Sequence, residues 1–302
     1  MYEGRRVGVV VPVYNEERFV GRVIETVPPF VDRLYVVDDA STDGTWSEIN
    51  DHTVETWEDV DPQSVPLADG GEAGFRVVAI RHGHNQGRGG AVKTGYQATL
   101  EHDVDVVAVM DGDGQMDPSI LHEIVDPVVR GEADYVVGNR LGQPGTWREM
   151  PPFRLFGNLL LTGITRIASG FWSLSDPQNG YTAISRRALE ALNLDALYDE
   201  YGFLNDVLVR LNVHGFEVVN VPMHARYGEE SSGIRYSSFV PKLSALLGWL
   251  FIWRLTTKLT SDQGVDPPET YRILSKRIED GPVDGSLDHH GDSRQAEGVE
   301  EA

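Results

Sequence analysis

The 302-residue chain contains no cysteine. Disulfides, cysteine-ligated zinc and thiol catalysis are therefore excluded. Lysine is nearly as scarce, because it occurs only at Lys93, Lys242, Lys258 and Lys276, and the formal net charge is −21. Nucleic-acid binding requires clustered positive charge, so this composition argues against a nucleic acid as partner.

A long uninterrupted apolar run is also missing. The most apolar stretch is 239–259, and its uninterrupted core, 245–253, is far shorter than the roughly 20 residues of a membrane-spanning helix. Tryptophans with basic residues near the ends are typical of a helix that lies in a membrane interface. A helix packed on the protein itself, or on a second copy of the chain in a homodimer, would show a similar pattern.

The N-terminal segment predicts a strand and no signal peptide. Two arginines precede an apolar run, but that run is short and contains Pro12. We therefore expect a cytoplasmic protein. If 239–259 is interfacial, the protein lies peripherally on the inner face of the cell membrane.

The acidic excess with so little lysine suggests a halophilic protein that works in concentrated salt. At about 1 M ionic strength the Debye length falls to roughly 3 Å, so an acidic surface no longer repels itself. An ordinary acidic protein with an acidic tail would have the same charge balance.

The stretch VDVVAVMDGDGQMDP, residues 104–118, is the most informative of the chain. Its valine-rich run predicts a buried strand, and the acidic cluster follows where that strand leaves the sheet. On an extended backbone Asp111 and Asp113 would point the same way and Gly112 the other way. Two converging carboxylates repel each other unless a divalent cation joins them, and Mg²⁺ or Mn²⁺ suits oxygen ligands and substrate phosphates. A solvated acidic turn is the plain alternative.

Two other ligand-binding motifs are excluded by single residues. An EF-hand would need glycine at Met116 and glutamate at His122. A P-loop would need glycine at Val92, before Lys93. The glycines at 87, 89 and 90 instead predict a close-packed turn before a helix, with Arg88 or Lys93 near phosphate.

Strand and helix patterns alternate along the chain, which predicts an α/β fold with a mostly parallel sheet. The predicted strands are 7–13, 34–38, 75–81, 106–110, 135–138, 181–185 and 216–221. The predicted helices are 15–27, capped by Asn15, and then 91–101, 117–130, 151–172, 186–192 and 203–214. We expect an α/β domain over 1–235 with a solvated acidic insertion at 51–74, an apolar helix over 236–260, and a largely disordered acidic tail over 261–302.

Ligands of parallel sheets bind beyond the carboxyl ends of the strands. An aromatic ring and several acceptors that suit a base and a ribose gather there: Pro12, Tyr14, Asn15, Glu16, Asp38 and Asp39. His82 and His84 also lie near a strand end, but two histidines without further ligands are expected to be surface residues.

Five segments, in this order and near these spacings, resemble glycosyltransferase family 2 with its GT-A fold. They are VVVPVYNEE, VVDDASTDGT, NQGRGGAVKTG, DGDGQMDP and GNR, and the resemblance covers about 7–235. The chain looks most like the dolichyl-phosphate mannose synthase and polyprenyl-phosphate glycosyltransferase group. The cues are DGDGQ followed by GNR, Arg154, NGYTAISRRAL, and the RYGEES run before an apolar helix.

The resemblance implies an inverting hexosyltransferase whose donor is a UDP- or GDP-sugar and whose acceptor is a polyprenyl or dolichyl phosphate. It implies three sets of ligands: Asp111, Asp113 and Gln115 for Mg²⁺ or Mn²⁺; Pro12, Tyr14, Asn15, Glu16, Asp38, Asp39, Lys93, Asp111 and Gly112 for the nucleotide; and Arg140, Arg154 and Arg226 for phosphate. Guanidinium suits phosphate because it stays charged and binds in a bidentate way. Surface ion pairing is the plain reading of these arginines.

The acceptor decides whether a base is needed. A lipid phosphate is already ionised at neutral pH, whereas a saccharide hydroxyl must lose a proton. The resemblance makes Asp206 the first candidate for that base and Asp176 the second, with Arg140 beside the reacting groups. The family's usual Glu-Asp pair reads Asn205-Asp206 here. A nucleotidyltransferase lacks support because the N-terminal segment has no glycine-rich signature loop, and a catalytically silent binding protein is the remaining alternative.

Overall fold

The computed structural model describes residues 1–53, 55–57, 76–140, 152–200, 202–223 and 236–260. Within these residues the strands form one eight-stranded sheet in the order β3-β4-β2-β1-β5-β7-β6-β8. The strands are β1 (Val7–Val13), β2 (Arg33–Asp38), β3 (Glu55–Trp57), β4 (Arg76–Arg81), β5 (Val106–Val109), β6 (Tyr135–Asn139), β7 (Thr182–Ser185) and β8 (Val218–Pro222).

The sheet is mostly parallel, which confirms the α/β fold predicted from the sequence. β7 is the reversed strand and pairs antiparallel with both β5 and β6. Thr182, the first residue of β7, is opposite Val109 and Val137 near the ends of its two neighbours. The turn that precedes β7 therefore shares an edge of the sheet with the segments that follow β5 and β6.

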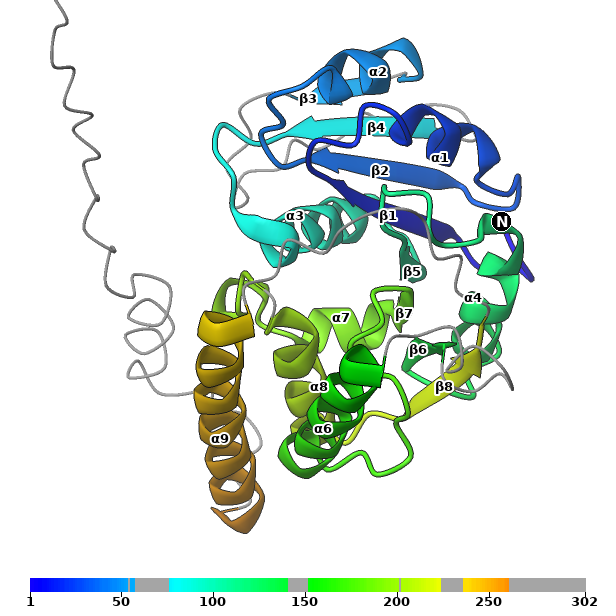
Figure 1. Ribbon diagram of the computed structural model, residues 1–302. Coiled ribbons are helices and arrows are strands. Elements are labelled where there is room, and N and C mark those ends of the chain that lie inside the picture. The colour runs from blue at the N-terminus through cyan, green and yellow to red at the C-terminus, as the bar shows by residue number, and fades with distance from the viewer. Residues whose placement is uncertain (54, 58–75, 141–151, 201, 224–235, 261–302) are drawn as a thin grey trace, which may run out of the picture.

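Helices cover both faces of the sheet (Figure 1). One core cluster joins the sheet to α1 (Val20–Thr26), α2 (Thr45–Asp51) and α4 (Leu121–Val129), and a second joins its other face to α3 (Gly87–Glu101), α7 (Arg186–Ala191) and α8 (Phe203–His214). Short 3₁₀ turns, Pro118–Ile120 and Leu194–Ala196, precede α4 and follow α7. This two-sided cover is what the near-continuous hydrophobic strands require.

A third apolar cluster lies outside this sandwich. It joins α8 to α6 (Pro152–Ser169) and α9 (Tyr236–Thr260), which pack side by side at one end of the molecule (Figure 1). On α9 the inward stripe is Leu243, Leu246, Leu247, Leu250 and Trp253. None of the described helices is long and apolar enough to cross a membrane.

Several predicted boundaries were wrong for local reasons. α1 begins at Val20, because Asn15 has a left-handed φ of 58° and turns the chain instead of capping it. α3 begins at Gly87, four residues earlier than predicted. The predicted insertion contains strand β3, and its residues 58–74 lie outside the described residues, as does the predicted tail.

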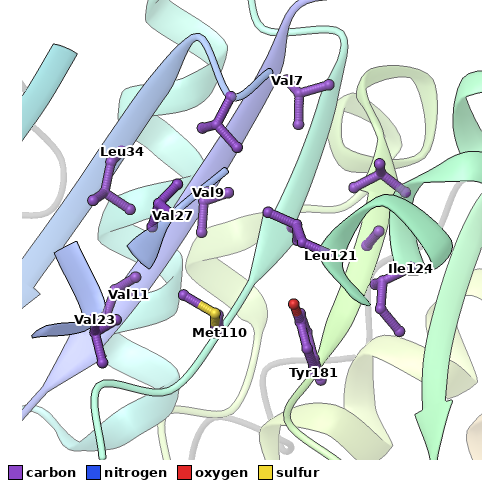
Figure 2. Packing of buried hydrophobic residues seen from close by; sticks show 14 of the residues in the cluster. Val7, Val9, Val11, Val23, Val27, Leu34, Met110, Leu121, Ile124 and Tyr181 are labelled. Atoms are coloured by element: carbon purple, nitrogen blue, oxygen red, sulfur yellow. The ribbon is translucent and has the colours of Figure 1, made fainter. Parts of the chain in front are cut away.

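The strand that leads to the acidic cluster is firmly anchored. Met110, directly after β5, is 1% exposed and belongs to the same core cluster as Leu121 and Tyr181 (Figure 2). The Tyr181 hydroxyl donates a hydrogen bond to the carbonyl of Asp117, 3.2 Å away. Both ends of the 111–117 segment are thus fixed to the core.

Candidate active site

The acidic segment lies where the chain order of the sheet switches direction, between β1 and β5. Ligands of open α/β sheets bind at such a point, outside the carboxyl ends of the strands. The Gly112 amide donates to the Pro12 carbonyl over 3.4 Å. A Cβ on Gly112 would come 2.2 Å from Cγ1 of Val13, so only glycine allows this approach to β1.

The acidic segment is a turn, which corrects the expectation of an extended backbone. Residues 112–114 turn, with Gly114 at a φ of 73°. Oδ1 of Asp113 accepts the backbone N–H of Gln115 at 2.9 Å. The alternation argument for Asp111 and Asp113 therefore does not apply, and their relation depends on this turn.

Arg88, on α3, is the basic residue that pairs with Asp111 of this turn. Its Nε and Nη2 lie 2.8 and 2.6 Å from Oδ1 of Asp111, and its Nη2 also donates to the Gly180 carbonyl at 3.3 Å. The two charged side chains are 31% and 26% exposed, so a ligand can reach them. A Cβ on Gly180 would come 2.7 Å from Oδ2 of Asp111, which puts the turn before β7 against the pair.

The residues of the turn fit a hard divalent cation. Asp111, Asp113 and Gln115 are all partly exposed and offer carboxylate and amide oxygens at the sheet edge. No group of three histidine, cysteine, aspartate or glutamate side chains suited to a metal occurs in the described part of the chain. A Mg²⁺ or Mn²⁺ ion here would take its remaining ligands from water and phosphate, as is usual for Mg²⁺.

The segments after β1 and β2 hold each other in place. Oδ1 of Asn15 accepts the amide of Thr42 at 2.8 Å, and the amide of Glu16 donates to Oγ1 of Thr45 at 2.8 Å. Tyr14 is exposed, whereas Pro12 is buried within β1. The structure thus brings the residues predicted to bind the nucleoside together at one edge of the sheet. The side-chain oxygen of Asn15, however, already accepts a hydrogen bond from Thr42.

Asp38, the last residue of β2, and Asp39, which follows it, are both buried and differ in their partners. Asp38 lies 3.2 Å from Nε of Arg81 and accepts the amide of Ser41, and burial raises the pKa of its carboxyl. Asp39 accepts both Nδ1–H of His82 and the amide of Gln86 at 2.8 Å.

The expectation that His82 is a surface residue was wrong. Its ring is buried, with Nδ1 at 2.8 Å from Asp39 and Nε2 at 2.9 Å from the hydroxyl of Thr94 on α3. His84, in contrast, is exposed. The position of His82 could have indicated this contact, because His82 directly follows β4 and Asp39 directly follows β2, the neighbouring strand.

Lys93 contacts the segment that precedes α8. It forms an ion pair with Asp199 and donates to the carbonyl of Leu197 at 3.3 Å. Arg88, five residues earlier on α3, is the residue of that helix that contacts Asp111. The sequence left Arg88 and Lys93 as alternative candidates near phosphate, and five residues of helix place their side chains on different sides of α3.

Arg140 and Asp176 form a bidentate ion pair beyond the end of β6. The Nε–Oδ2 and Nη2–Oδ1 distances are 2.7 and 2.9 Å, and the Arg140 amide also donates to Asp176. Bidentate guanidinium–carboxylate pairs are among the strong charge-assisted contacts. The proposed phosphate ligand and the second base candidate therefore neutralise each other in this state.

Asp206 is fully buried on α8 and is also paired. Oδ1 of Asp206 lies 2.9 Å from Nε of Arg210, and Oδ2 accepts the amide of Tyr198 at 3.0 Å. Arg210 also donates to the Ala196 carbonyl at 2.7 Å. This network fixes the segment before α8, and the i, i+4 spacing of an aspartate and an arginine on one helix was the signal for it.

The remaining predicted phosphate ligands are less defined. Arg154 lies in the first turn of α6. Arg226 lies outside the described residues. Neither position tests the prediction.

Comparison with known proteins gives the family. The chain matches the family described as Glycosyl transferase family 2 over residues 8–192, more than half of its length. An undecaprenyl-phosphate mannosyltransferase of Micrococcus luteus is 31% identical over 223 residues, or 72% of this chain and 82% of that protein. A UDP-N-acetylglucosamine–dolichyl-phosphate N-acetylglucosaminyltransferase of Methanococcus voltae is 28% identical over 224 residues, or 74% and 86%.

Solved structures agree on the fold. Glucosyl-3-phosphoglycerate synthase of Mycobacterium tuberculosis in complex with UDP aligns with a TM-score of 0.54 and 21% identity over 88% of this chain and 82% of that chain. A structure of the same enzyme holds Mn²⁺ and UDP-glucose. The similarity confirms the GT-A fold inferred from the motifs. With the family match over most of the sheet, the chain is a glycosyltransferase and belongs to glycosyl transferase family 2.

Proposed function

We propose that this enzyme transfers a hexose from a UDP- or GDP-sugar to a polyprenyl phosphate such as dolichyl phosphate, with inversion at the anomeric carbon. The relatives of Micrococcus luteus and Methanococcus voltae, whose names specify polyprenyl-phosphate acceptors, support this choice of acceptor. The observation that carries it is that both candidate bases are held in ion pairs with arginine.

A hydroxyl acceptor would need a carboxylate that can take a proton. Asp206 is fully buried against Arg210, and Asp176 is bound at both oxygens by Arg140. A carboxylate whose oxygens are already held by a guanidinium would have to break that contact before it could accept a proton from a hydroxyl. An ionised phosphate needs no such base, so this arrangement favours a phosphate acceptor.

The reacting groups would meet at the sheet edge. An acceptor phosphate oxygen forms the new bond to the anomeric carbon, while the bond from that carbon to the nucleotide diphosphate breaks and the diphosphate leaves with the electron pair. Asp111, Asp113 and Gln115 would hold Mg²⁺ or Mn²⁺, which when bound neutralises charge that develops on the leaving diphosphate.

Two arginines at this edge of the sheet would bind the phosphate groups of the substrates. Arg88 and Arg140 are each oriented by one carboxylate and are partly exposed, so each can contact phosphate oxygens while it keeps its carboxylate partner. Pre-paired guanidinium groups are already oriented, which reduces the entropy lost when they bind phosphate. We assign Arg88 to the donor side, beside the acidic turn, and Arg140 to the acceptor side.

Organic-phase extraction tests the reaction directly. The enzyme is incubated with MnCl₂, dolichyl phosphate and radiolabelled UDP-glucose, UDP-N-acetylglucosamine or GDP-mannose. We expect label to enter the organic phase with one of these donors and to require both the metal and the lipid phosphate. Label that appears only on added saccharides would support the hydroxyl acceptor instead.

The alternative with Asp206 as base can be tested without leaving a buried charge unpaired. Asp206→Asn alone would leave the buried charge of Arg210 without its carboxylate partner and cost about 3–5 kcal/mol of stability. A loss of activity in that variant could then come from unfolding as well as from the loss of a base. We expect the double variant Asp206→Leu with Arg210→Met to fold and to keep transfer to dolichyl phosphate within about tenfold. A loss of 10²–10⁴-fold in a folded double variant is the size expected for a general base, and it would contradict our proposal.

A further inference from the structure

Helices α6 and α9 contain no acidic residue. Their 18 and 25 residues carry five basic side chains in a chain with 47 acidic residues. At the average frequency of the chain, roughly seven aspartates and glutamates would be expected there, so these two helices differ sharply from the rest of the molecule.

Both helices expose apolar side chains on the side opposite their buried stripe. On α9, Ile252, Leu255 and Leu259 follow an i, i+3, i+7 spacing, roughly opposite Leu250 and Trp253 of the inward stripe. On α6, Leu160 and Ile167 lie one above the other, two turns apart. Trp172, in the turn after α6, is 69% exposed.

Arg254 of α9 contacts the C-terminal end of α6. Its Nη2 donates to the Ile167 carbonyl at 3.0 Å, and a Cβ on Gly170 would come 2.2 Å from its Nη1. The end of α6 and the turn that follows it therefore lie against α9 at Arg254. Figure 1 shows the two helices side by side at the end of the molecule away from β3 and α2.

We propose that Leu160, Ile167, Trp172, Ile252, Leu255 and Leu259 form one docking face, the α6–α9 face, for an anionic lipid bilayer. These side chains are 40–83% exposed. Apolar side chains that enter the lipid interface, beside basic residues such as Lys258 at its edge, are the two sources of affinity of an interfacial helix. The inference rests on the proposed function, since a polyprenyl phosphate resides in a membrane.

Charge decides between a bilayer and a second copy of the chain. In a twofold dimer this face would meet itself, so the basic residues of one copy would approach those of the other. The other surfaces of a chain with net charge −21 would in turn be repelled by an anionic bilayer. Among the surfaces formed by the described residues, the α6–α9 face is therefore the one best suited to such a membrane.

Vesicle flotation of the full chain tests this proposal without any substrate. We expect the protein to float with vesicles of phosphatidylglycerol and phosphatidylcholine, and binding to pure phosphatidylcholine to be at least about tenfold weaker at low salt. The variant Ile252→Ser with Leu255→Ser and Leu259→Ser should lose at least about tenfold in partition to either vesicle, because these side chains would leave water on binding. Since all three are exposed, its melting temperature should stay close to that of the wild type.

Charge reversal provides a matched pair of variants. Lys258→Glu lies on the α6–α9 face and should weaken binding to anionic vesicles severalfold. Arg22→Glu changes the net charge equally on the exposed side of α1 and should leave it unchanged. Equal losses in both variants, unchanged flotation of the triple variant, or a concentration-dependent dimer that the triple variant abolishes would each overturn the proposal.

Transfer to a short-chain, water-soluble prenyl phosphate separates this proposal from the proposed function. That transfer should proceed without vesicles and be equal in the wild type and the triple variant. Transfer without vesicle binding would overturn the docking face and leave the reaction standing. Vesicle binding without transfer to any prenyl phosphate would overturn the reaction, with the docking face retained as a lipid contact.

Discussion

At the scale of single residues, charged side chains at the sheet edge are committed to partners. Arg88 is bound to Asp111, Arg140 to Asp176 and Arg210 to Asp206. The first two pairs are partly open to solvent and the third is buried. Exposure therefore separates the pairs that a substrate can reach from the pair that supports the fold.

Prediction of these pairs from the sequence was uneven. The acidic turn stood out because its residues are consecutive. The Arg88–Asp111 and Arg140–Asp176 pairs join segments that are 23 and 36 residues apart, and no local pattern specifies which arginine meets which carboxylate. Asp206 was assigned a chemical role from the resemblance, whereas Arg210, one helical turn later, was the local sign of a buried pair.

His102 gives a pH dependence that is specific to one residue. It is buried between α3 and β5, and its ring forms a hydrogen bond with the hydroxyl of Tyr35. Burial, together with the nearby Arg33 and Arg76, lowers the pKa of His102 to about 4. The unfolded chain binds this proton near pH 6.5, so the free energy of unfolding falls as pH decreases from 6.5 toward 4. Between pH 7 and 5 the loss from this group should be about 2 kcal/mol.

Urea unfolding at pH 7 and pH 5 measures this effect. His102→Gln keeps a hydrogen-bonding side chain but does not titrate. We expect the wild type to lose about 2 kcal/mol more than the variant over this interval. Equal pH slopes in the two proteins would show that His102 titrates normally in the folded state.

At the scale of elements, Gly95 of α3 sets how closely that helix packs on the sheet. A Cβ on Gly95 would come 2.3 Å from Cγ1 of Val10 on β1, inside the core. Gly248 on α9 has open space around the same position. The two glycines both lie within helices, so they form a matched pair.

We predict opposite signs for the same substitution. Gly95→Ala should destabilise the fold by about 1–3 kcal/mol, because overpacking moves α3 away from β1. Gly248→Ala should stabilise it by about 0.5–1 kcal/mol, because alanine favours a helix. Thermal unfolding of both variants checks this, and stabilisation by Gly95→Ala would contradict the close packing described here.

Elements were predicted better than their boundaries. Phe203–His214 was predicted residue for residue as a helix, and the strands that end in the site were all found. The start of α1 was wrong because Asn15 turns the chain with a positive φ, a feature that asparagine tolerates but does not require. The pairing of the reversed strand β7 between β5 and β6 depends on long-range contacts and was not specified by its own residues.

At the scale of the whole molecule, charge is divided between two surfaces. Acidic residues dominate the chain as a whole, while α6 and α9 contain none. This division suits an enzyme whose soluble surface faces an aqueous, salt-rich medium and whose α6–α9 face contacts lipid. The salt adaptation stays a prediction from composition.

Salt dependence of stability tests that prediction. Screening should reduce the repulsion among surface carboxylates, so we expect the melting temperature to rise by several degrees between 0.05 and about 2 M KCl. The comparison at equal ionic strength with a salt of another cation, such as NaCl, separates screening from ion-specific effects. A melting temperature that stays constant or falls would make this an ordinary acidic protein.

Metal-dependent nucleotide binding tests the central claim most directly. Isothermal titration of UDP and GDP is carried out with and without MnCl₂ on the wild type, on Asp113→Ala, and on Asp195→Ala, which removes an exposed carboxylate elsewhere. We predict that Mn²⁺ strengthens binding of one nucleotide at least about tenfold in the wild type and in Asp195→Ala, and not in a folded Asp113→Ala protein. An equal effect of Mn²⁺ in all three proteins would contradict the assignment of the acidic turn as the donor site.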